Sequence, residues 1–282
     1  MFLRERIPGD SKYLSDRSTL KGHAKNVILP NDETELREGI RYSSKGNTKL
    51  TISGTRMCSQ GGAVPCGGDV MSMERLSGVI GAGVDERGTY LRVLPCTSIS
   101  LFNNSISSGR VCSLDECDVP LDSLRFPVKA EPENSVGGCI AVNRSNIRPF
   151  VRRLKVVFSD STFVTFERGE YIASGRKMTF PAGRNFFAFD LPSYDSDADF
   201  GPKISSDMDL IDLFVGSEGI FGVITEADIY LSDTVKDGPT EESGKLSNFR
   251  IKDRYGQKAV EDLKRIKEIL DPSYILNIVN LL

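Results

Sequence analysis

The residues most able to take part in chemistry lie between 51 and 72, in the stretch TISGTRMCSQGGAVPCGGDVMS. Five of the fifteen residues from 54 to 68 are glycines: Gly54, Gly61, Gly62, Gly67 and Gly68, with Pro65 between the two pairs. Glycine loses much backbone entropy on ordering, so this density indicates a backbone requirement. Either Cβ-free backbone wraps an anion such as a diphosphate with its N–H groups, or glycine supplies positive φ in a run of tight turns.

No common nucleotide-binding motif is present in this stretch. It matches neither G-x-G-x-x-G nor G-x-x-x-x-G-K-[ST], so a bound nucleotide would be held by another architecture. A second run of small residues, ENSVGGCIAVNRSN, occupies 133–146 and places Gly137 and Gly138 just before an apolar run. Two interpretations again apply, either close approach of the backbone to a ligand or a turn or β-bulge.

Two single residues are further candidates. Glu218 lies between glycines in the apolar stretch 207–231. On the surface it would carry no function, whereas a partly buried, hydrogen-bonded carboxylate would be functional. The one histidine, His23, lies in the polar segment LKGHAKN, where we expect a solvated loop. A mechanism that needs a histidine base therefore has a single candidate.

Metal and disulfide chemistry are not expected. The six cysteines (58, 66, 96, 112, 117 and 139) form no C-x-x-C motif, and their spacing does not fit a zinc site. We interpret them as free, buried thiols in a reducing cytoplasm.

Composition excludes several classes of protein. The chain of 282 residues is long enough for one large domain or two of ordinary size. Its net charge of −3 gives no basic footprint for nucleic acid. No apolar run reaches the ~18–20 residues of a membrane span. The first residues, MFLRERIPGD, lack the apolar region of a signal peptide. We therefore expect a cytoplasmic protein.

The first third of the chain predicts a β–α–β unit that positions the glycine-rich loop. Asp32 can cap a helix over 32–46, with Glu35 three residues later as in a capping box. The strand KLTIS (49–53) follows, then the loop, then the strand DVMSM (69–73). A hairpin turn is predicted at 86–88, and a short helix over 97–106.

In the rest of the chain, some segments have a clear pattern and others have little. Residues 107–135 and 168–206 have little pattern and are expected to be loops. Alternation predicts a hairpin over 151–167. A helical turn at 210–214 precedes the strand VITEADIYL (223–231). Apolar residues three and four apart predict an amphipathic helix over 256–270. The apolar end YILNIVNLL must pack against another part of the protein.

Four segments, in the same order, resemble the FAD-linked oxidases of the vanillyl-alcohol oxidase type. They are SGTR…GGAVPCGGDVMSMERL (53–76), ENSVGGCIAVN (133–143), VRRLKVVFSDS (151–161) and DLIDLFVGSEGIFGVITEADIYL (209–231). The glycolate oxidase and D-lactate dehydrogenase branch is the most similar. The tail 244–277 resembles the family's C-terminus as well, so the resemblance covers most of the chain.

This resemblance implies an α+β fold, the PCMH-type FAD-binding fold of two α+β subdomains with FAD between them. The FAD-binding domain would be 1–232, with subdomains of about 1–105 and 106–232. Residues 233–248 would be a linker in place of the family's substrate domain, and 249–282 a C-terminal helix and tail.

The resemblance also implies which residues contact FAD. The first diphosphate-binding loop would comprise Gly54, Thr55, Arg56, Gly61 and Gly62, flanked by Pro65 and Ser72. The second contact stretch would comprise Ser135, Gly137, Gly138 and Asn143. The wall on the adenosine side would comprise Glu218, Gly222, Val223 and Ile224.

The chain departs from the family pattern at several of these places. Met57-Cys58 replaces Thr-Gly, Asn146 stands where glycine is expected, and the stretch after Asn143 is shortened. Ala198-Asp199-Phe200 replaces Ala-Gly-Tyr, and Glu241-Glu242-Ser243-Gly244 lacks the histidine of the family's Glu-His-Gly-x-Gly motif.

Three functions follow as alternatives. The first is an FAD-dependent oxidoreductase that oxidises a 2-hydroxy acid by hydride transfer to flavin N5, with a partner chain completing the substrate site. The second is an FAD-binding subunit or pseudoenzyme without turnover. The third is a degenerate scaffold that has lost FAD. No catalytic residue is assigned, because no histidine matches the family's base. Loss of a domain also predicts an exposed apolar face, covered by a homo-oligomer or partner subunit.

Overall fold

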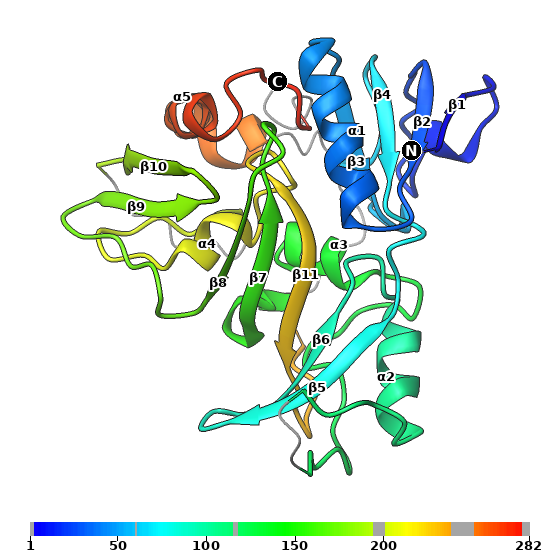
Figure 1. The fold of residues 1–282 in the computed structure, drawn as a ribbon, viewed down its shortest axis with the longest axis vertical. Helices are drawn as coiled ribbons and strands as arrows, with labels where there is room; N and C mark the ends of the chain where they lie inside the picture. The colour runs from blue at the N-terminus through cyan, green and yellow to red at the C-terminus, as the bar shows by residue number, and fades with distance from the viewer. Residues whose placement is uncertain (1–2, 60, 115–117, 194–200, 238–250, 278–282) are drawn as a thin grey trace.

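The computed structural model describes residues 3–59, 61–114, 118–193, 201–237 and 251–277. Two main β-sheets, a separate hairpin and several helices make up the fold (Figure 1). The α+β class predicted from the sequence is confirmed. Predictions for Cys117, Ala198–Phe200, residues 238–248 and 278–282 lie outside the described residues.

The first sheet has four strands in the spatial order β1-β2-β4-β3. Its strands are β1 (Leu3–Arg6), β2 (Asn26–Leu29), β3 (Leu50–Ser53) and β4 (Asp69–Ser72). β4 is inserted between β2 and β3 and is parallel to both, whereas β1 is antiparallel to β2. The carboxyl end of β3, from which the glycine-rich loop departs, therefore lies beside the end of β4.

Helix α1 (Glu33–Lys45) packs on this sheet, with Leu36 and Ile40 fully buried. It begins as predicted, because the Asp32 carboxylate accepts a hydrogen bond from the N–H of Glu35 (2.8 Å). The reciprocal half of the capping box is shifted by one residue. Glu35 accepts from the N–H of Asn31 (3.0 Å) instead of that of Asp32.

The second sheet has five antiparallel strands in the order β5-β6-β11-β7-β8. They are β5 (Val79–Asp85), β6 (Gly88–Val93), β7 (Val151–Val157), β8 (Phe163–Glu167) and β11 (Val223–Tyr230). The chain passes from the first sheet to the second between Ser72 and Val79, because β5 and β6 belong to the second sheet. The subdomain boundary near residue 105 stays a prediction.

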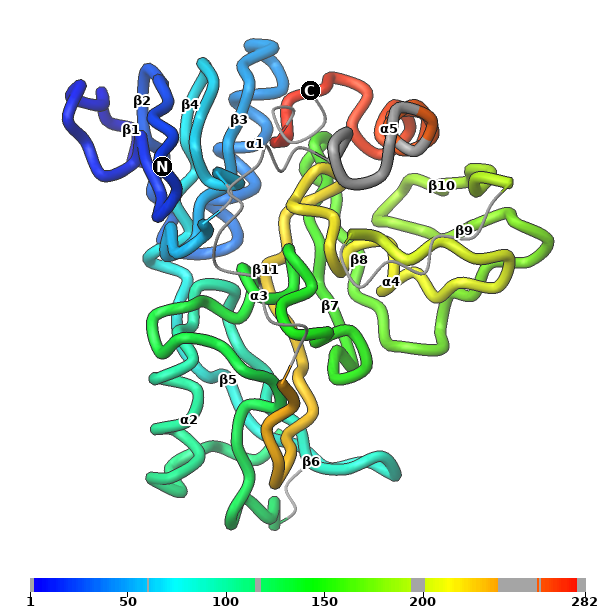
Figure 2. The backbone as a smooth tube through the Cα atoms, turned by 180° about the vertical axis from the view of Figure 1, so that it is seen from behind, coloured from blue at the N-terminus to red at the C-terminus, as the bar shows by residue number. Residues whose placement is uncertain are grey.

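Helices α2 (Ile99–Ser107) and α3 (Val136–Ala141) pack on one face of the five-stranded sheet. In Figure 2 α3 lies across β11, whereas α2 lies beside β5 and β6. Each begins with a serine cap: Ser98 accepts from the N–H of Leu101 (3.1 Å) and Ser135 from that of Gly138 (3.2 Å). The Gly137-Gly138 pair therefore lies inside a short helix and not in the predicted turn or bulge.

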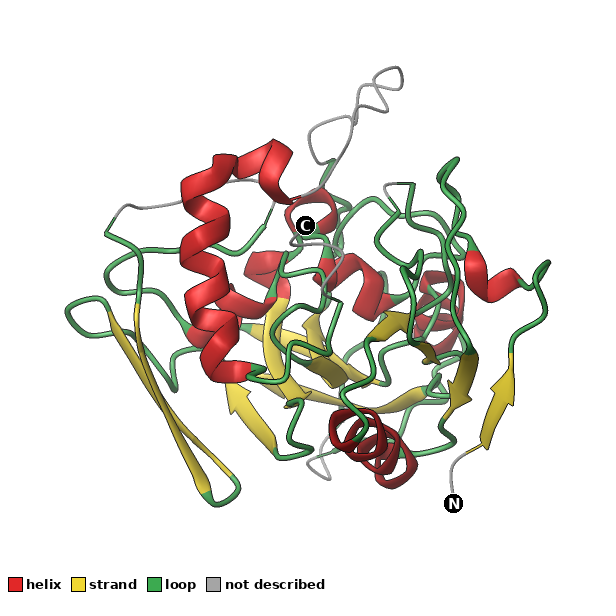
Figure 3. Cartoon of the chain, turned by 90° about the horizontal axis from the view of Figure 1, so that it is seen from above, coloured by secondary structure: helices red, strands yellow, loops and turns green. Residues whose placement is uncertain are grey.

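The largest error of the sequence-based prediction is in residues 168–206. The chain there forms a hairpin of β9 (Lys177–Ala182) and β10 (Asn185–Asp190), which extends to one side of the molecule (Figure 3). Met178, Phe180 and Ala182 alternate with exposed residues and are buried. Pro181 and the flanking glycines concealed this alternation, because they are typical of loops.

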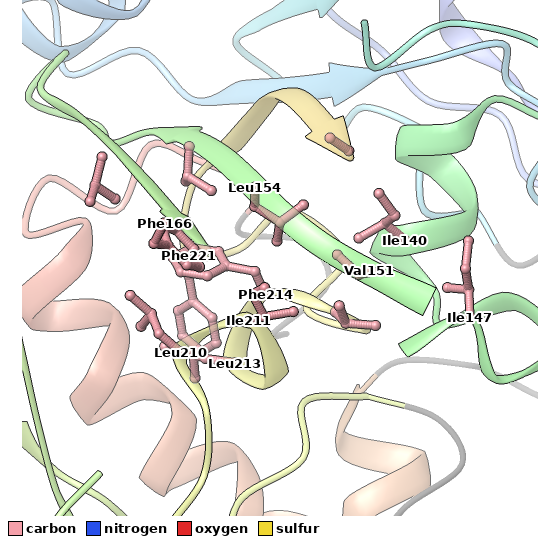
Figure 4. Close-up of a cluster of buried hydrophobic side chains, with 14 of the residues drawn as sticks. Ile140, Ile147, Val151, Leu154, Phe166, Leu210, Ile211, Leu213, Phe214 and Phe221 are labelled. Atoms are coloured by element: carbon pink, nitrogen blue, oxygen red, sulfur yellow. The ribbon is translucent and has the colours of Figure 1, made fainter. Parts of the chain in front are cut away.

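Helix α4 (Leu210–Phe214) lies at the centre of the core, with all five residues buried. Asp209 caps it by accepting from the N–H of Ile211 (2.8 Å). Figure 4 shows its side chains against Phe166 of β8 and Phe221. Three short 3-10 helices complete the described elements: Lys12–Leu14, Arg144–Asn146 and Arg148–Phe150.

Helix α5 (Ile251–Leu270) begins five residues before the predicted start. Val260, Leu263, Ile266 and Leu270 are buried as predicted. The chain then runs beside β3, where the N–H of Leu50 donates to Ile275 O (2.7 Å) and the N–H of Asn277 to Leu50 O (3.0 Å). The C-terminal segment thus packs against the first sheet. No helix of the described part is long and apolar enough to cross a membrane.

A fully buried ion pair fixes this segment. The ammonium group of Lys267 donates to Asp271 Oδ2 (2.7 Å), Ile220 O (2.6 Å) and Leu276 O (2.8 Å). Both side chains have no exposed surface. Burial lowers the pKa of Lys267, and the Asp271 carboxylate opposes part of that shift.

Lys267→Met should lower the free energy of unfolding by about 3–5 kcal/mol, because it leaves the Asp271 carboxylate buried and unpaired. Lys267→Met/Asp271→Asn should recover part of the loss, because no isolated charge remains. Urea unfolding of the three proteins measures both effects. A double variant less stable than the single variant would contradict this explanation.

Candidate functional site

A cavity of about 800 Å³ lies between the two sheets. Its walls come from three separated parts of the chain: the loop after β3 (54–63), the stretch 129–146 that contains α3, and the stretch 217–224 that leads into β11. Ile52, Met73, Pro95, Asp237 and Asn277 complete the lining.

Most of the residues predicted to contact a cofactor are brought together here. Twelve line the cavity: Gly54, Thr55, Arg56, Gly62, Ser135, Gly137, Gly138, Asn143, Glu218, Gly222, Val223 and Ile224. Gly61, Pro65 and Ser72 are not part of the lining. For the twelve lining residues, contact with a cofactor stays a prediction. Gly61, Pro65 and Ser72 do not line the cavity, so the structure offers no support for a cofactor contact there.

The three excluded residues have structural roles behind the cavity. Gly61 has a φ of +83°, and a Cβ there would meet Leu20 at 2.6 Å. The carbonyl of Pro65 accepts from the N–H of His23 (3.0 Å). Ser72 is fully buried in β4, paired with Ser53 of β3. Gly67 and Gly68 also have positive φ values. The glycine-rich stretch therefore forms turns in one part and a wall of the cavity in another.

The first loop presents unused hydrogen-bond donors. The N–H groups of Gly54, Thr55 and Gly62 donate no hydrogen bond to another described residue. Arg56 also lines the cavity, with a φ of +59°, and its guanidinium lies 3.7 Å from Glu74 and over the ring of Tyr13. This combination of backbone amides and a cation suits an anionic ligand.

Glu74 places a negative charge next to the guanidinium of Arg56. Burial alone would raise the pKa of Glu74, but hydrogen bonds from Lys12 and Tyr13 lower it overall. The carboxylate therefore stays ionised at neutral pH and holds Arg56 at the edge of the cavity.

The second stretch differs from expectation. The N–H of Gly137 donates to Pro95 O (2.8 Å) and that of Gly138 to Ser135 Oγ (3.2 Å). These two amides are therefore bonded within the protein and are not free to bind an anion. Gly137 permits close packing, since a Cβ there would lie 2.8 Å from Pro95 O. A Cβ on Gly138 would lie 2.9 Å from Ser135 Oγ and near no other atom. The backbone of Gly138 therefore faces the cavity without a side chain in between.

The loop after β3 contacts the stretch 129–146 at Gly54, where the absence of a side chain permits close approach. A Cβ on Gly54 would lie 2.9 Å from Ser135 Oγ. Beyond α3, Asn143, Ser145 and Asn146 have φ values of 50°, 49° and 56°. Asparagine tolerates this left-handed conformation better than most residues. Asn146 thus adopts a backbone that suits the glycine of the family pattern.

Glu218 is buried rather than on the surface, and its functional role stays a prediction. It is 9% exposed and has a φ of +53°. Its N–H donates to Ala141 O (2.8 Å), and its carbonyl accepts from the side chain of Asn277 (2.7 Å). Its Oε2 lies 3.9 Å from where a Cβ on Gly62 would be. The carboxylate therefore faces the first loop across the cavity.

The segment 14–25, which sequence analysis left without a role, supports the first loop. The N–H of Arg17 donates to Cys58 O (3.1 Å), and that of Gly67 to His23 O (2.7 Å). Gly22 packs directly on Pro65. Arg17 also forms an ion pair with Glu131 of the opposite wall. Apart from this ion pair the contacts are made by backbone groups, which leave no periodic pattern in the sequence.

No histidine is among the described residues that line the cavity. His23 is exposed and is not among the lining residues. Among the described residues no group of three or more His, Cys, Asp or Glu could hold a metal ion.

Comparisons with known proteins support the fold. No family model matches the chain, and no curated protein does. Among solved structures, alkyldihydroxyacetonephosphate synthase matches with a TM-score of 0.50 and 14% identity, over 76% of this chain and 35% of that one. A second crystal form gives 0.49 and 15%, over 75% and 32%. At this identity the likeness concerns the fold, and the chain spans about a third of the matched proteins.

Two buried thiols near the cavity should be unreactive. Burial raises the pKa of Cys96 to about 11 and that of Cys139 to about 12, although nearby arginines act in the opposite direction. At about pH 8 iodoacetamide, which reacts with thiolates, should alkylate exposed Cys66 and Cys112 and spare the buried pair. Peptide mass spectrometry measures this. Alkylation of Cys139 as fast as that of Cys66 would contradict the described burial.

Proposed function

We propose that this chain binds FAD in the cavity between its two sheets and serves as the flavin-binding part of an oxidoreductase. The proposal rests on one observation above all. Twelve residues predicted from the FAD-linked oxidase resemblance, from three distant segments, line one cavity.

The residues present fit such a cofactor. A volume of about 800 Å³ is within the ~300–1,000 Å³ typical of ligand pockets. The unused amides of the first loop, with Arg56, would hold the diphosphate. The bare backbone at Gly138 would permit close approach of the ligand, and Glu218 offers acceptor oxygens for hydroxyl groups. The fold shared with alkyldihydroxyacetonephosphate synthase is further support.

The proposed reaction is oxidation of a 2-hydroxy acid. Bound FAD would supply the hydride acceptor. One fold supports many reactions, so this substrate class rests on the sequence resemblance rather than on the fold match. The described lining contains no histidine to accept the hydroxyl proton. We therefore place that base on a partner chain or a second copy, which would also cover the face left by the missing domain.

A second candidate function is FAD binding without turnover, and one observation favours it. General-base catalysis is typically worth ~10²–10⁴ in rate, and the described lining lacks a group usual for it in this family. In either case the five free cysteines among the described residues suit a reducing compartment such as the cytoplasm.

Absorption spectroscopy of the purified chain tests FAD binding. Bands near ~370 and ~450 nm, present on purification or after addition of FAD and gel filtration, are expected of a bound flavin. Their absence in both samples would leave the scaffold alternative. Anaerobic mixing with D-lactate or glycolate then tests turnover. Bleaching would show hydride transfer with a base supplied by this chain or by its second copy. An unchanged spectrum would leave two explanations, a base on a different partner chain or FAD binding without turnover.

Gly138→Val should abolish retention of FAD, because a branched side chain would fill the space in front of α3. Gly9→Val is a matched control, because a Cβ at Gly9 meets nothing within 4 Å and the residue lies outside the cavity. Flavin content per chain and thermal unfolding are measured for both. A folded Gly138→Val protein with full flavin content would remove α3 from the site.

A further inference from the structure

We propose that Asn277, in the C-terminal segment 271–277, is a positioning residue of the cofactor site that holds Glu218 in place. This inference rests on the proposed function. It adds a fourth wall to the cavity that neither the motifs nor the resemblance assigned to it.

The side-chain amide of Asn277 joins two walls of the cavity. Its Oδ1 accepts from the N–H of Ile52 in β3 (2.7 Å), and its Nδ2 donates to the carbonyl of Glu218 (2.7 Å). Asn277 is 6% exposed and is itself part of the lining. Replacing it would remove the partner of one buried backbone carbonyl, that of Glu218, and of one partly buried N–H, that of Ile52.

Glu218 needs such support because its backbone is strained. A φ of +53° in a residue other than glycine costs free energy and persists only where the surroundings enforce it. The carbonyl that Asn277 holds belongs to the same residue. Holding this carbonyl restrains the backbone of Glu218, from which the carboxylate that faces Gly62 extends.

The next residue shows how closely the amide is packed. A Cβ at Gly219 would lie 2.5 Å from Asn277 Nδ2, and the φ of Gly219 is +75°. One residue further, the carbonyl of Ile220 accepts from Lys267 (2.6 Å). Two side chains of the C-terminal region therefore hold alternate carbonyls of the loop 218–220.

Binding of FAD and packing of the C-terminal segment are then coupled. If the packed segment is needed for the arrangement of Glu218 that FAD prefers, FAD must in turn stabilise the packed segment, since linkage is reciprocal. The N–H of Ile52 reports this packing, because it exchanges with solvent only when Asn277 releases it.

Asn277→Asp is the sharpest test, because it keeps the shape of the side chain and the acceptor for Ile52. It replaces the donor to Glu218 with a carboxylate oxygen that repels the carbonyl. Affinity for FAD, measured by flavin fluorescence titration, should fall about tenfold or more near neutral pH, as expected for one lost buried hydrogen bond. Ser273→Ala, in the same segment, is the control and should bind as the wild type does.

A pH profile separates positioning from a general loss of structure. Protonation gives the carboxyl group introduced by Asn277→Asp an O–H donor, so the ratio of variant to wild-type dissociation constants should decrease as the pH falls. Glu218, Asp271 and Lys267 are present in both proteins, so the ratio isolates position 277. A ratio that stays constant or rises as the pH falls would contradict the inference.

Asn277→Ala and hydrogen exchange provide a second measurement if Asn277→Asp folds poorly. The alanine variant should also lose affinity at least tenfold, and FAD should slow exchange at Ile52 in the wild type. If the wild type binds FAD and both variants bind it with the same affinity, this inference alone would be overturned. The same holds if FAD binds the wild type but leaves exchange of the Ile52 amide unchanged. A wild-type chain that binds no FAD would overturn the proposed function and this inference with it.

Discussion

The candidate site depends on the close approach of two segments of the chain at a glycine, which has no side chain to keep them apart. Gly54, at the end of β3, lies so near Ser135 that a Cβ would come within 2.9 Å of its hydroxyl. This contact brings the first loop against α3 and fixes the width of the cavity. Since protein interiors are close-packed and yield little, a larger residue at position 54 would displace one wall.

Predictions succeeded where local patterns dictate the structure. Helix α1 and the hairpin of β7 and β8 follow from a capping aspartate and from alternation. The hairpin of β9 and β10 was missed because Pro181 and nearby glycines are loop signals. Sheet order was beyond reach too, since pairing of β11 with β6 and β7 depends on contacts between residues more than sixty positions apart.

The site was predicted in part for the same reason. Motif resemblance identified which segments share a cavity, because glycine-rich sequence marks places where backbone approaches closely. It did not reveal which amides are free, since the N–H of Gly137 is used by Pro95 O, a partner distant in sequence. The supporting segment 14–25 and Asn277 act through single hydrogen bonds to backbone, which leave no pattern to detect.

The central position of β11 has a consequence for how the protein forms. β5 and β6 are made early during synthesis and β7 and β8 later, yet β11 alone joins these two hairpins into one sheet. Until residue 230 has left the ribosome, β6 and β7 each present an unpaired edge. Such edges invite pairing with other chains, so assembly of the second sheet is slow by topology and is the stage at which the nascent protein most needs protection from aggregation.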